Sequence, residues 1–158
     1  MLTALSDLQG LSLDDAQITD AGCSMLSKFP RLNSLSLSGT RIGDEGLRYV
    51  ASLQFLQILI LSGTQVEDAG LVHLENQASI EWLFLDRTRV TDAGLKHLAE
   101  MPGLIGLNLS DTAITDAGLQ HLADAKGLRK LLLQRTRVTP EGVSQLKRRL
   151  PKCEIGYP

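Results

Sequence analysis

The chain lacks the sequence features that are typical of disulfide-rich, membrane and disordered proteins. Its 158 residues include two cysteines, five prolines and only 4% aromatic residues. No apolar stretch approaches the roughly 18 residues of a membrane-spanning helix, and the first residues lack the basic and apolar segments of a signal peptide. At 43% hydrophobic and 22% charged, the composition is neither disordered nor collagen-like. We therefore expect a folded, cytoplasmic domain that does not enter a membrane.

The two cysteines are too far apart to form a disulfide. Cys23 and Cys153 are separated by 130 positions, which is more than five copies of the 24-residue repeat described below. At roughly 4.8 Å per strand this separation exceeds about 20 Å, whereas the Cα atoms of a disulfide lie within about 7 Å. Free thiols are expected, and they fit a reducing compartment.

The net charge of −2 conceals an uneven distribution along the chain. Residues 1–125 carry 16 acidic and 7 basic side chains, which gives −9, whereas residues 126–152 carry one acidic and nine basic side chains, which gives +8. Glu154 supplies the remaining negative charge. Without a net positive charge the protein is not expected to bind nucleic acid. Its basic end instead favours an acidic partner.

Leucine is the commonest residue, 31 of 158, and it recurs with a period of 24 and no insertion. Each copy reads L-x-x-L-x-L-x-x-T-x-I-T-D-A-G-L-x-x-L, and the six copies start near residues 8, 32, 56, 80, 104 and 128. The L-x-L step has the period of a strand with one buried face, and the apolar residues that follow the Ile/Val position have helical spacing. We predict six parallel strands, centred on Leu11, Leu35, Leu59, Leu83, Leu107 and Leu131.

One position is Asp in five copies and Pro140 in the sixth, and it indicates where each helix starts. Only the first helical turn suits both residues, because Pro lacks an N–H group and Asp favours the positive end of the helix. Each Asp is therefore predicted to serve its own helix, a simpler interpretation than a calcium site. A glycine two residues later occurs in all six copies, and we expect a side chain there to strike a neighbouring coil. The threonines predicted as N-caps are Thr19, Thr91, Thr115 and Thr139.

On these residues the chain resembles leucine-rich-repeat proteins, specifically the class with helices on the convex side. Ribonuclease-inhibitor-like repeats and GALA-type bacterial repeats are the most similar subtypes, and residues 40–46, TRIGDEG, look especially like the latter. The resemblance implies an α/β fold, a right-handed β-α superhelix with a parallel sheet on its concave side, and a role in protein–protein interaction. Thr stands where the family usually has Asn or Cys, and we expect its hydroxyl to bond the backbone of the neighbouring coil.

We expect a single domain over residues 1–158, with a C-terminal half-repeat at 150–158. Ile155 falls on strand register, so a seventh strand should close that end. At the other end, Leu2 and Leu5 fall on the register of a preceding helix. The sequence thus predicts a fragment, or a chain without an N-terminal cap, and leaves a homodimer through this end open.

The variable positions on the open face of the strands carry the candidate binding site. Copies three and four place Ile58, Ile60, Trp82 and Phe84 as a two-by-two block on adjacent strands, surrounded by serines and including the only tryptophan. Gly106 is expected to leave a gap beside Trp82 that a partner side chain could enter. An apolar centre with an aromatic anchor and a polar rim is typical of a protein interface.

Asn108 and Leu132, on the next two strands, are expected to support this site. Two alternatives stay open. One is that bulky residues occur here only because they suit strands. The other is that the face is covered by a second copy or by a missing domain.

Arginines recur on the loops that leave the strands, and Arg87 and Arg89 are candidates for binding carboxylates with their forked guanidinium groups. The alternative is a set of solvated charges that form weak surface pairs. The full column comprises Arg41, Arg87, Arg89, Arg135 and Arg137.

No metal, cofactor or catalytic group is expected. His73, His97 and His121 share one position of the repeat, but packed helices lie roughly 8–10 Å apart, too far for three imidazoles to reach one zinc ion. Their role is left open. Neither cysteine has a histidine in an adjacent coil, and motifs for phosphate binding or hydrolysis are missing. We predict a non-enzymatic module that binds a protein or peptide on its concave face. The alternative is the substrate-recognition or sensor portion of a larger enzyme or effector, such as a ligase adaptor.

Overall fold

Each 24-residue copy of the sequence folds into one short strand and one short helix in the computed structural model, which describes residues 7–158. All seven strands are parallel and lie in chain order in one sheet. Partners across the sheet are 24 residues apart, as in Leu35↔Leu59, because no copy contains an insertion. The predicted strand centres and the closing strand at Ile155 are confirmed. The strands are β1 (Gly10–Ser12), β2 (Ser34–Ser36), β3 (Ile58–Ile60), β4 (Trp82–Phe84), β5 (Gly106–Asn108), β6 (Lys130–Leu132) and β7 (Glu154–Gly156).

The helical segments begin at the predicted column of Asp and Pro residues and are mostly one or two turns long. Several change from α to 3₁₀ geometry part-way, and only the last helix, which starts with Pro140, reaches ten residues. The α-helices are α1 (Asp20–Cys23), α2 (Asp44–Val50), α3 (Asp68–Leu71), α4 (Leu95–Ala99), α5 (Asp116–His121) and α6 (Pro140–Arg149). The 3₁₀ segments are η2 (Ser24–Lys28), η3 (Val72–Leu74), η4 (Asp92–Gly94) and η5 (Leu122–Asp124).

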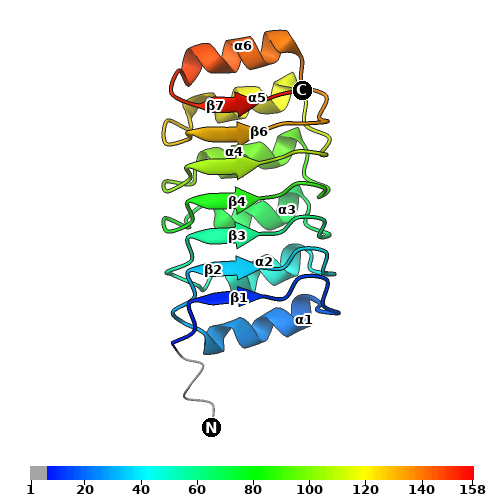
Figure 1. Ribbon diagram of the computed structural model, residues 1–158, viewed down its shortest axis with the longest axis vertical. Coiled ribbons are helices and arrows are strands. Elements are labelled where there is room, and N and C mark those ends of the chain that lie inside the picture. Colours follow the sequence, from blue (N-terminus) through cyan, green and yellow to red (C-terminus); the bar gives the residue numbers. More distant parts are fainter. Residues whose placement is uncertain (1–6) are drawn as a thin grey trace.

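The repeats stack into a column that has the sheet on one side and the helices on the other (Figure 1). In this view α1 lies below β1 and α6 lies above β7, so the row of helices is longer than the row of strands. Strands pair at about 4.8 Å, whereas packed helices need roughly 8–10 Å. The sheet is therefore the shorter, concave side of a curved β-α solenoid.

A continuous layer of aliphatic side chains fills the space between sheet and helices. Leu35, Leu59 and Leu83, the central residues of three strands, have no exposed surface. Cys23 and Cys153 are buried and free, and burial raises the pKa of the Cys23 thiol to about 11. Such thiols stay protonated at neutral pH and are therefore poor nucleophiles.

The N-terminal end of this core is less well covered than its middle. Leu11 and Leu13 are half-buried, whereas their counterparts one copy later, Leu35 and Leu37, are completely buried. The positions of Leu2 and Leu5, which suggested a preceding helix, lie outside the described residues.

The aspartates lie in the first turn of their own helices, as expected, and they also bond to the next repeat. Asp68 accepts a hydrogen bond from the backbone N–H of Thr91 at 2.7 Å and another from its hydroxyl at 2.5 Å. Four other aspartates also accept a hydrogen bond from the backbone N–H of the N-cap residue 23 positions later: Asp20, Asp44, Asp92 and Asp116. We call this row the aspartate ladder. Among the predicted threonine caps, the side chains of Thr115 and Thr139 accept a bond from their own helix, whereas those of Thr19 and Thr91 do not.

The repeated glycine leaves room for this ladder. A Cβ atom on Gly142 would overlap Oδ1 and Cγ of Asp116 and lie 2.9 Å from Oδ2, and no other side chain is as close. Asp116 cannot easily move away, because it accepts bonds from the N–H and hydroxyl of Thr139 at 2.8 and 2.6 Å. The predicted clash with a neighbouring coil is thus a clash with one carboxylate.

The threonine column also differs from its expected role. The hydroxyl of Thr64 donates to the carbonyl of Leu61 in its own turn at 2.7 Å, and Thr40, Thr88, Thr112 and Thr136 make the equivalent bond. Next to the threonines, adjacent coils are joined by backbone hydrogen bonds, for example from the N–H of Gly63 to the carbonyl of Asp86 at 2.8 Å. Each threonine closes its own turn and does not bridge to a neighbour.

The ladder predicts strong coupling between Asp116 and Gly142. We expect Gly142→Ala to destabilise the protein in the wild-type background, by about 1–3 kcal/mol, because the new methyl group overlaps the bonded carboxylate. In an Asp116→Ala background the same change should be neutral or stabilising, because alanine is about 1 kcal/mol better than glycine inside a helix. Urea unfolding of the four proteins in this cycle measures the coupling. Equal costs in both backgrounds would contradict the ladder.

The half-covered N-terminal end predicts graded protection along the column. The amides of β1 should exchange with deuterium faster than those of β4, because β1 is an edge strand over an incompletely buried part of the core. Hydrogen exchange followed by mass spectrometry measures this difference. Equal protection of the two strands would show that the N-terminal end is as stable as the middle.

Candidate binding surface on the concave sheet

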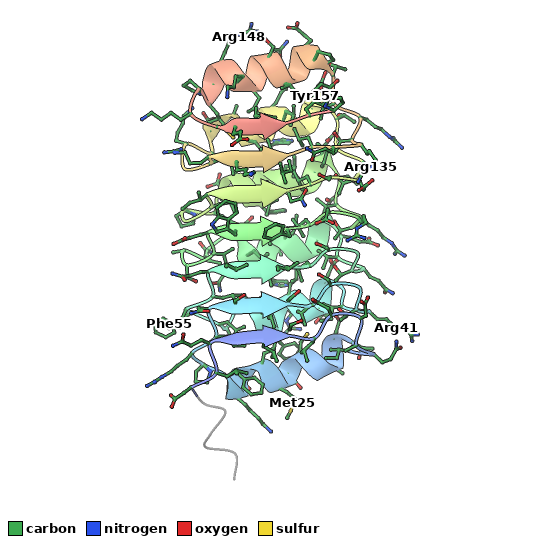
Figure 2. All side chains as sticks on the ribbon, in the orientation of Figure 1. Met25, Arg41, Phe55, Arg135, Arg148 and Tyr157 are labelled. Atoms are coloured by element: carbon green, nitrogen blue, oxygen red, sulfur yellow. The ribbon has the colours of Figure 1, made fainter. Side chains whose placement is uncertain are left out.

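The strands bring the predicted apolar block together on the open face of the sheet. By register, Ile58 pairs with Trp82 and Ile60 with Phe84, on β3 and β4. All four side chains are half-buried, so they shield one another more than the sequence suggested. The large apolar side chains with most exposed surface lie off this face, at Met25, Tyr49, Phe55 and Val72. Figure 2 shows Phe55 at the side of the column and Met25 at its lower end.

Trp82 occupies the space that Gly106 was expected to leave for a partner. A Cβ atom on Gly106 would overlap Cε3 and Cζ3 of the indole and lie 2.9 Å from its Cδ2, so the ring lies across the backbone of β5. Gly106 is buried as a result. The expected gap is therefore filled by the chain's own tryptophan, and the opening lies further along the sheet.

That opening is a pocket of about 190 Å³ over β4, β5 and β6. Its volume corresponds to about six water molecules, which is the scale of one apolar side chain. We call it the concave pocket, and the side chains and glycine that line its surface are Trp82, Phe84, Gly106, Asn108, Lys130 and Leu132, with Leu83 and Leu107 beneath. Four predicted site residues, Trp82, Phe84, Asn108 and Leu132, thus line one cavity. Ile58 and Ile60 lie beside it. Lys130 also lines the cavity, although the sequence did not indicate this residue for the site.

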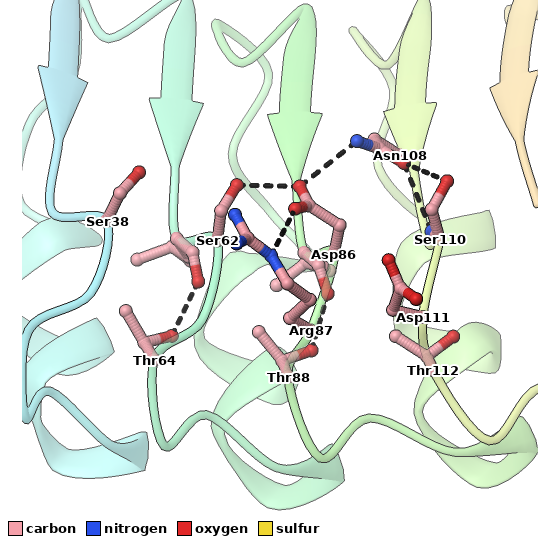
Figure 3. A network of polar contacts seen from close by, with 12 residues as sticks. Ser38, Ser62, Thr64, Asp86, Arg87, Thr88, Asn108, Ser110, Asp111 and Thr112 are labelled. Carbon is pink, nitrogen blue, oxygen red and sulfur yellow. Dashed lines mark hydrogen bonds and ion pairs between the residues drawn. The ribbon is translucent and has the colours of Figure 1, made fainter. Parts of the chain in front are cut away.

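A chain of hydrogen bonds runs along the rim of the pocket, where the strands end (Figure 3). Oδ1 of Asp86 accepts from the hydroxyl of Ser62 at 2.6 Å and from the amide of Asn108 at 3.0 Å. The carbonyl oxygen of Asn108 accepts from the N–H and the hydroxyl of Ser110, at 3.1 and 2.8 Å. Asn108 is therefore held in one orientation, and its second amide N–H group makes no hydrogen bond within residues 7–158.

Asp14, which stands at the position of Asp86 in the first copy, also accepts hydrogen bonds from its neighbours. Asp14 accepts bonds from the side chains of Ser12 and Ser36 and from the backbone of Ser38, and the bond from Ser36 is the main cause that lowers the pKa of Asp14.

Three of the loop arginines, just beyond this rim, are bound to acidic groups of the chain itself. Arg87 pairs with Asp86 at 3.2 Å, and Arg89 pairs with Glu67 at 3.0 Å. Arg135 makes two bonds to Asp111, which lower the pKa of that carboxyl group. All three arginines are exposed, so these pairs contribute little to stability. Neither Arg87 nor Arg89 lines the concave pocket.

At the position of Arg87 and Arg135, the backbone is in the left-handed conformation in every copy. Gly39 and Gly63 have φ of 67°, and Arg87 and Arg135 hold φ of 57° and 56° at the same position. A non-glycine residue in this region costs roughly 1 kcal/mol.

The histidine column does not form a metal site among the described residues, 7–158. His97 bonds instead to Glu75 of the preceding repeat, and His121 is exposed. Over the same residues, no helix is both long and apolar enough to cross a membrane.

The overlap of Gly106 with Trp82 predicts a spectroscopic response. Gly106→Ala should lift the indole off β5 and shift its emission to longer wavelength, because the ring becomes more exposed. Trp82 is the only tryptophan, so the emission spectrum reports this position alone. The matched control is Gly10→Ala, at the same place in β1, where an added methyl group would meet no atom within 4 Å. An unchanged spectrum of Gly106→Ala would show that the ring is not seated on this glycine.

Comparison with known proteins identifies the repeat. A family model described as leucine-rich repeat matches residues 31–51, 52–74 and 105–123. No curated protein matches the sequence.

Solved structures from bacteria share the fold. An internalin from Listeria monocytogenes has a TM-score of 0.65 at 20% identity, over 96% of this chain and 48% of its own. A leucine-rich-repeat protein from Leptospira interrogans has a TM-score of 0.72 at 24% identity, over 96% of this chain and 37% of its own. Internalin C2 from Listeria monocytogenes has a TM-score of 0.74 at 23% identity, over 99% and 74%. The chain thus spans about half, or less, of the first two, and these likenesses describe the fold and not the function.

The subtype, ribonuclease-inhibitor-like or GALA-type, stays a prediction. Six copies of one 24-residue unit and one parallel strand per copy agree with the family matches, and the chain has the fold of a leucine-rich-repeat solenoid.

Proposed function

We propose that this chain is a non-enzymatic binding module that holds a protein or peptide segment on its concave sheet. The observation that carries the proposal is the concave pocket, which has two aromatic walls and lies between the apolar side chains of β3 and Leu132 of β6. Serines occupy the corresponding positions of β2, Ser34 and Ser36, and Ser62 and Ser110 lie on the rim.

The chemistry of this surface matches that of a protein interface. An apolar centre enriched in aromatic residues, inside a polar rim, is where most binding free energy is concentrated. The rim is pre-ordered by the bonds of Asp86 and Asn108. A surface that is already ordered loses less conformational entropy when it binds. The leucine-rich-repeat fold is commonly a protein-binding module, which supports the same function.

The alternative, that the chain is the recognition or sensor portion of a larger enzyme or effector, stays a prediction. The solved structures above contain this fold within longer chains, which keeps it open. Dimerisation through the half-covered N-terminal end and a cytoplasmic location also stay predictions. The two buried thiols, Cys23 and Cys153, are compatible with a reducing compartment.

Selection from a random 12-residue peptide library displayed on phage tests the proposed function. We expect wild-type protein to enrich peptides whose binding is lost in Phe84→Ala, since truncating an aromatic anchor costs roughly 2–4 kcal/mol of binding. Phe55→Ala removes the same side chain from a position that is 63% exposed and off the concave face, and it should bind as wild type does. Peptides that bind Phe84→Ala unchanged would place the site elsewhere.

A second comparison separates binding from folding. Trp82 and Leu83 are adjacent in β4, but Leu83 has no exposed surface whereas Trp82 is half-buried. Leu83→Ala should cost about 2–5 kcal/mol of stability. Trp82→Ala should cost less, about 1–2 kcal/mol, because only one side of the ring is covered. Its larger loss should be in peptide affinity. Thermal unfolding alongside peptide binding measures both quantities, and a Trp82→Ala protein that binds peptides normally would contradict the proposal.

A further inference from the structure

The concave pocket has one charged wall. Lys130, the first residue of β6, lines the pocket two strands away from the aromatic residues of β4. Over residues 7–158, no ion pair within 4.0 Å involves Lys130. It is thus a cation beside an apolar cavity without an acidic partner in the described part of the chain.

Neither neighbouring acid forms an ion pair with Lys130. Glu154 is its register partner on β7, yet Glu154 neither pairs with it nor lines the pocket. Asp86, the acid on the rim, already accepts bonds from Ser62, Asn108 and Arg87. Lys130 can therefore pair with an acidic group of a bound molecule.

The seating of Trp82 explains why the cation and the apolar cavity adjoin. Trp82, Gly106 and Lys130 are register partners on consecutive strands. Because Gly106 has no side chain, the indole of β4 extends over β5 towards β6. Any larger residue at Gly106 would separate the aromatic wall from Lys130.

We infer that the concave pocket selects an apolar side chain that is flanked in the ligand by a carboxylate, as in an acidic peptide segment. The apolar side chain fills the cavity against Trp82, Phe84 and Leu132, and the carboxylate lies on the β6 side against Lys130. This inference rests on the proposed function and adds to it the chemistry of the partner.

The charge of the surrounding chain favours the same ligand. Residues 126–152, which include β6, carry a net charge of +8, whereas residues 1–125 carry −9. An acidic segment is therefore attracted to the β6 side of the pocket and repelled from the other end of the column. A polyanion such as nucleic acid lacks the apolar side chain that the cavity fits, and it would meet the acidic copies along its length.

Peptide titrations followed by the emission of Trp82 test this inference. The probes are three acetylated and amidated nonapeptides that share a Gly/Ser frame around a central triplet: Asp-Leu-Asp, the neutral Asn-Leu-Asn, and Asp-Ala-Asp. We expect the first to bind at least about fivefold more tightly than either of the others. The preference over Asn-Leu-Asn should shrink as salt is raised, because part of it is electrostatic. Equal affinity for Asp-Leu-Asp and Asn-Leu-Asn would overturn the inference.

Charge reversal assigns the preference to Lys130. Lys130→Glu should abolish the preference for Asp-Leu-Asp and enrich basic instead of acidic peptides from the phage library. Lys96→Glu makes the same charge change on the exposed side of α4 and should leave the preference intact. Unfolding temperatures of both variants establish that they are folded. An acidic preference that survives Lys130→Glu would overturn the role of this lysine.

Three further outcomes show whether the inference alone or also the proposed function fails. Peptides that bind wild type but not Phe84→Ala, without any enrichment of carboxylates, would refute the inference and leave the proposed function standing. A complete lack of peptide binding at this face would refute both. If Trp82 emission changes with protein concentration alone, together with dimer formation in light scattering, the occupant is a second copy and the inference is wrong.

Discussion

The contact on which the rest of the structure depends is the hydrogen bond that the aspartate of one coil accepts from a backbone N–H group of the next coil. It sets the distance between coils at the helix starts, as the backbone bonds of the parallel sheet do on the other side. A coil one residue longer would move its N–H away from the waiting carboxylate. The uninterrupted period of 24 residues is the consequence, and so is the glycine of the second to sixth copies, because a carboxylate lies where its Cβ atom would be. Each repeat is thereby stabilised by its neighbours rather than by itself.

Because the framework residues are committed to this stacking, variation is confined to positions that point away from it. The concave face illustrates how far a few such positions can change a surface. Serines make β2 nearly flat, whereas Trp82 and Phe84 on β4, with Gly106 beside them, produce a cavity. The cavity needs no departure from the repeat backbone, since the register across β4, β5 and β6 is uninterrupted.

The sequence predicted positions along the repeat well and contacts between repeats poorly, for a physical reason. Strand centres and helix starts follow from periodicity and local chemistry, which act within one copy. Every coil, however, presents the same types of residue at the same positions. The sequence around Asp68 or Thr64 therefore looks the same whether the residue bonds within its own coil or to the next one. Periodicity therefore could not show that Asp68 bonds forward to Thr91 while Thr64 bonds back to Leu61. The direction of the Trp82 ring was missed for a related reason, because it depends on the missing side chain at Gly106 in the adjacent strand.

Magnitudes show that the concave pocket alone cannot account for tight binding. Burial of one large apolar side chain contributes roughly 1.5–3 kcal/mol, whereas a micromolar complex needs about 8 kcal/mol in excess of the entropy lost on association. The rest has to come from neighbouring strands. Ile58 and Ile60 extend the apolar surface on one side and Leu132 does so on the other, so a partner in contact with all three spans β3 to β6. Affinity on this face is thus a property of four consecutive repeats. An anchor in the pocket fixes the register of the partner, and the flat strands on either side supply the area.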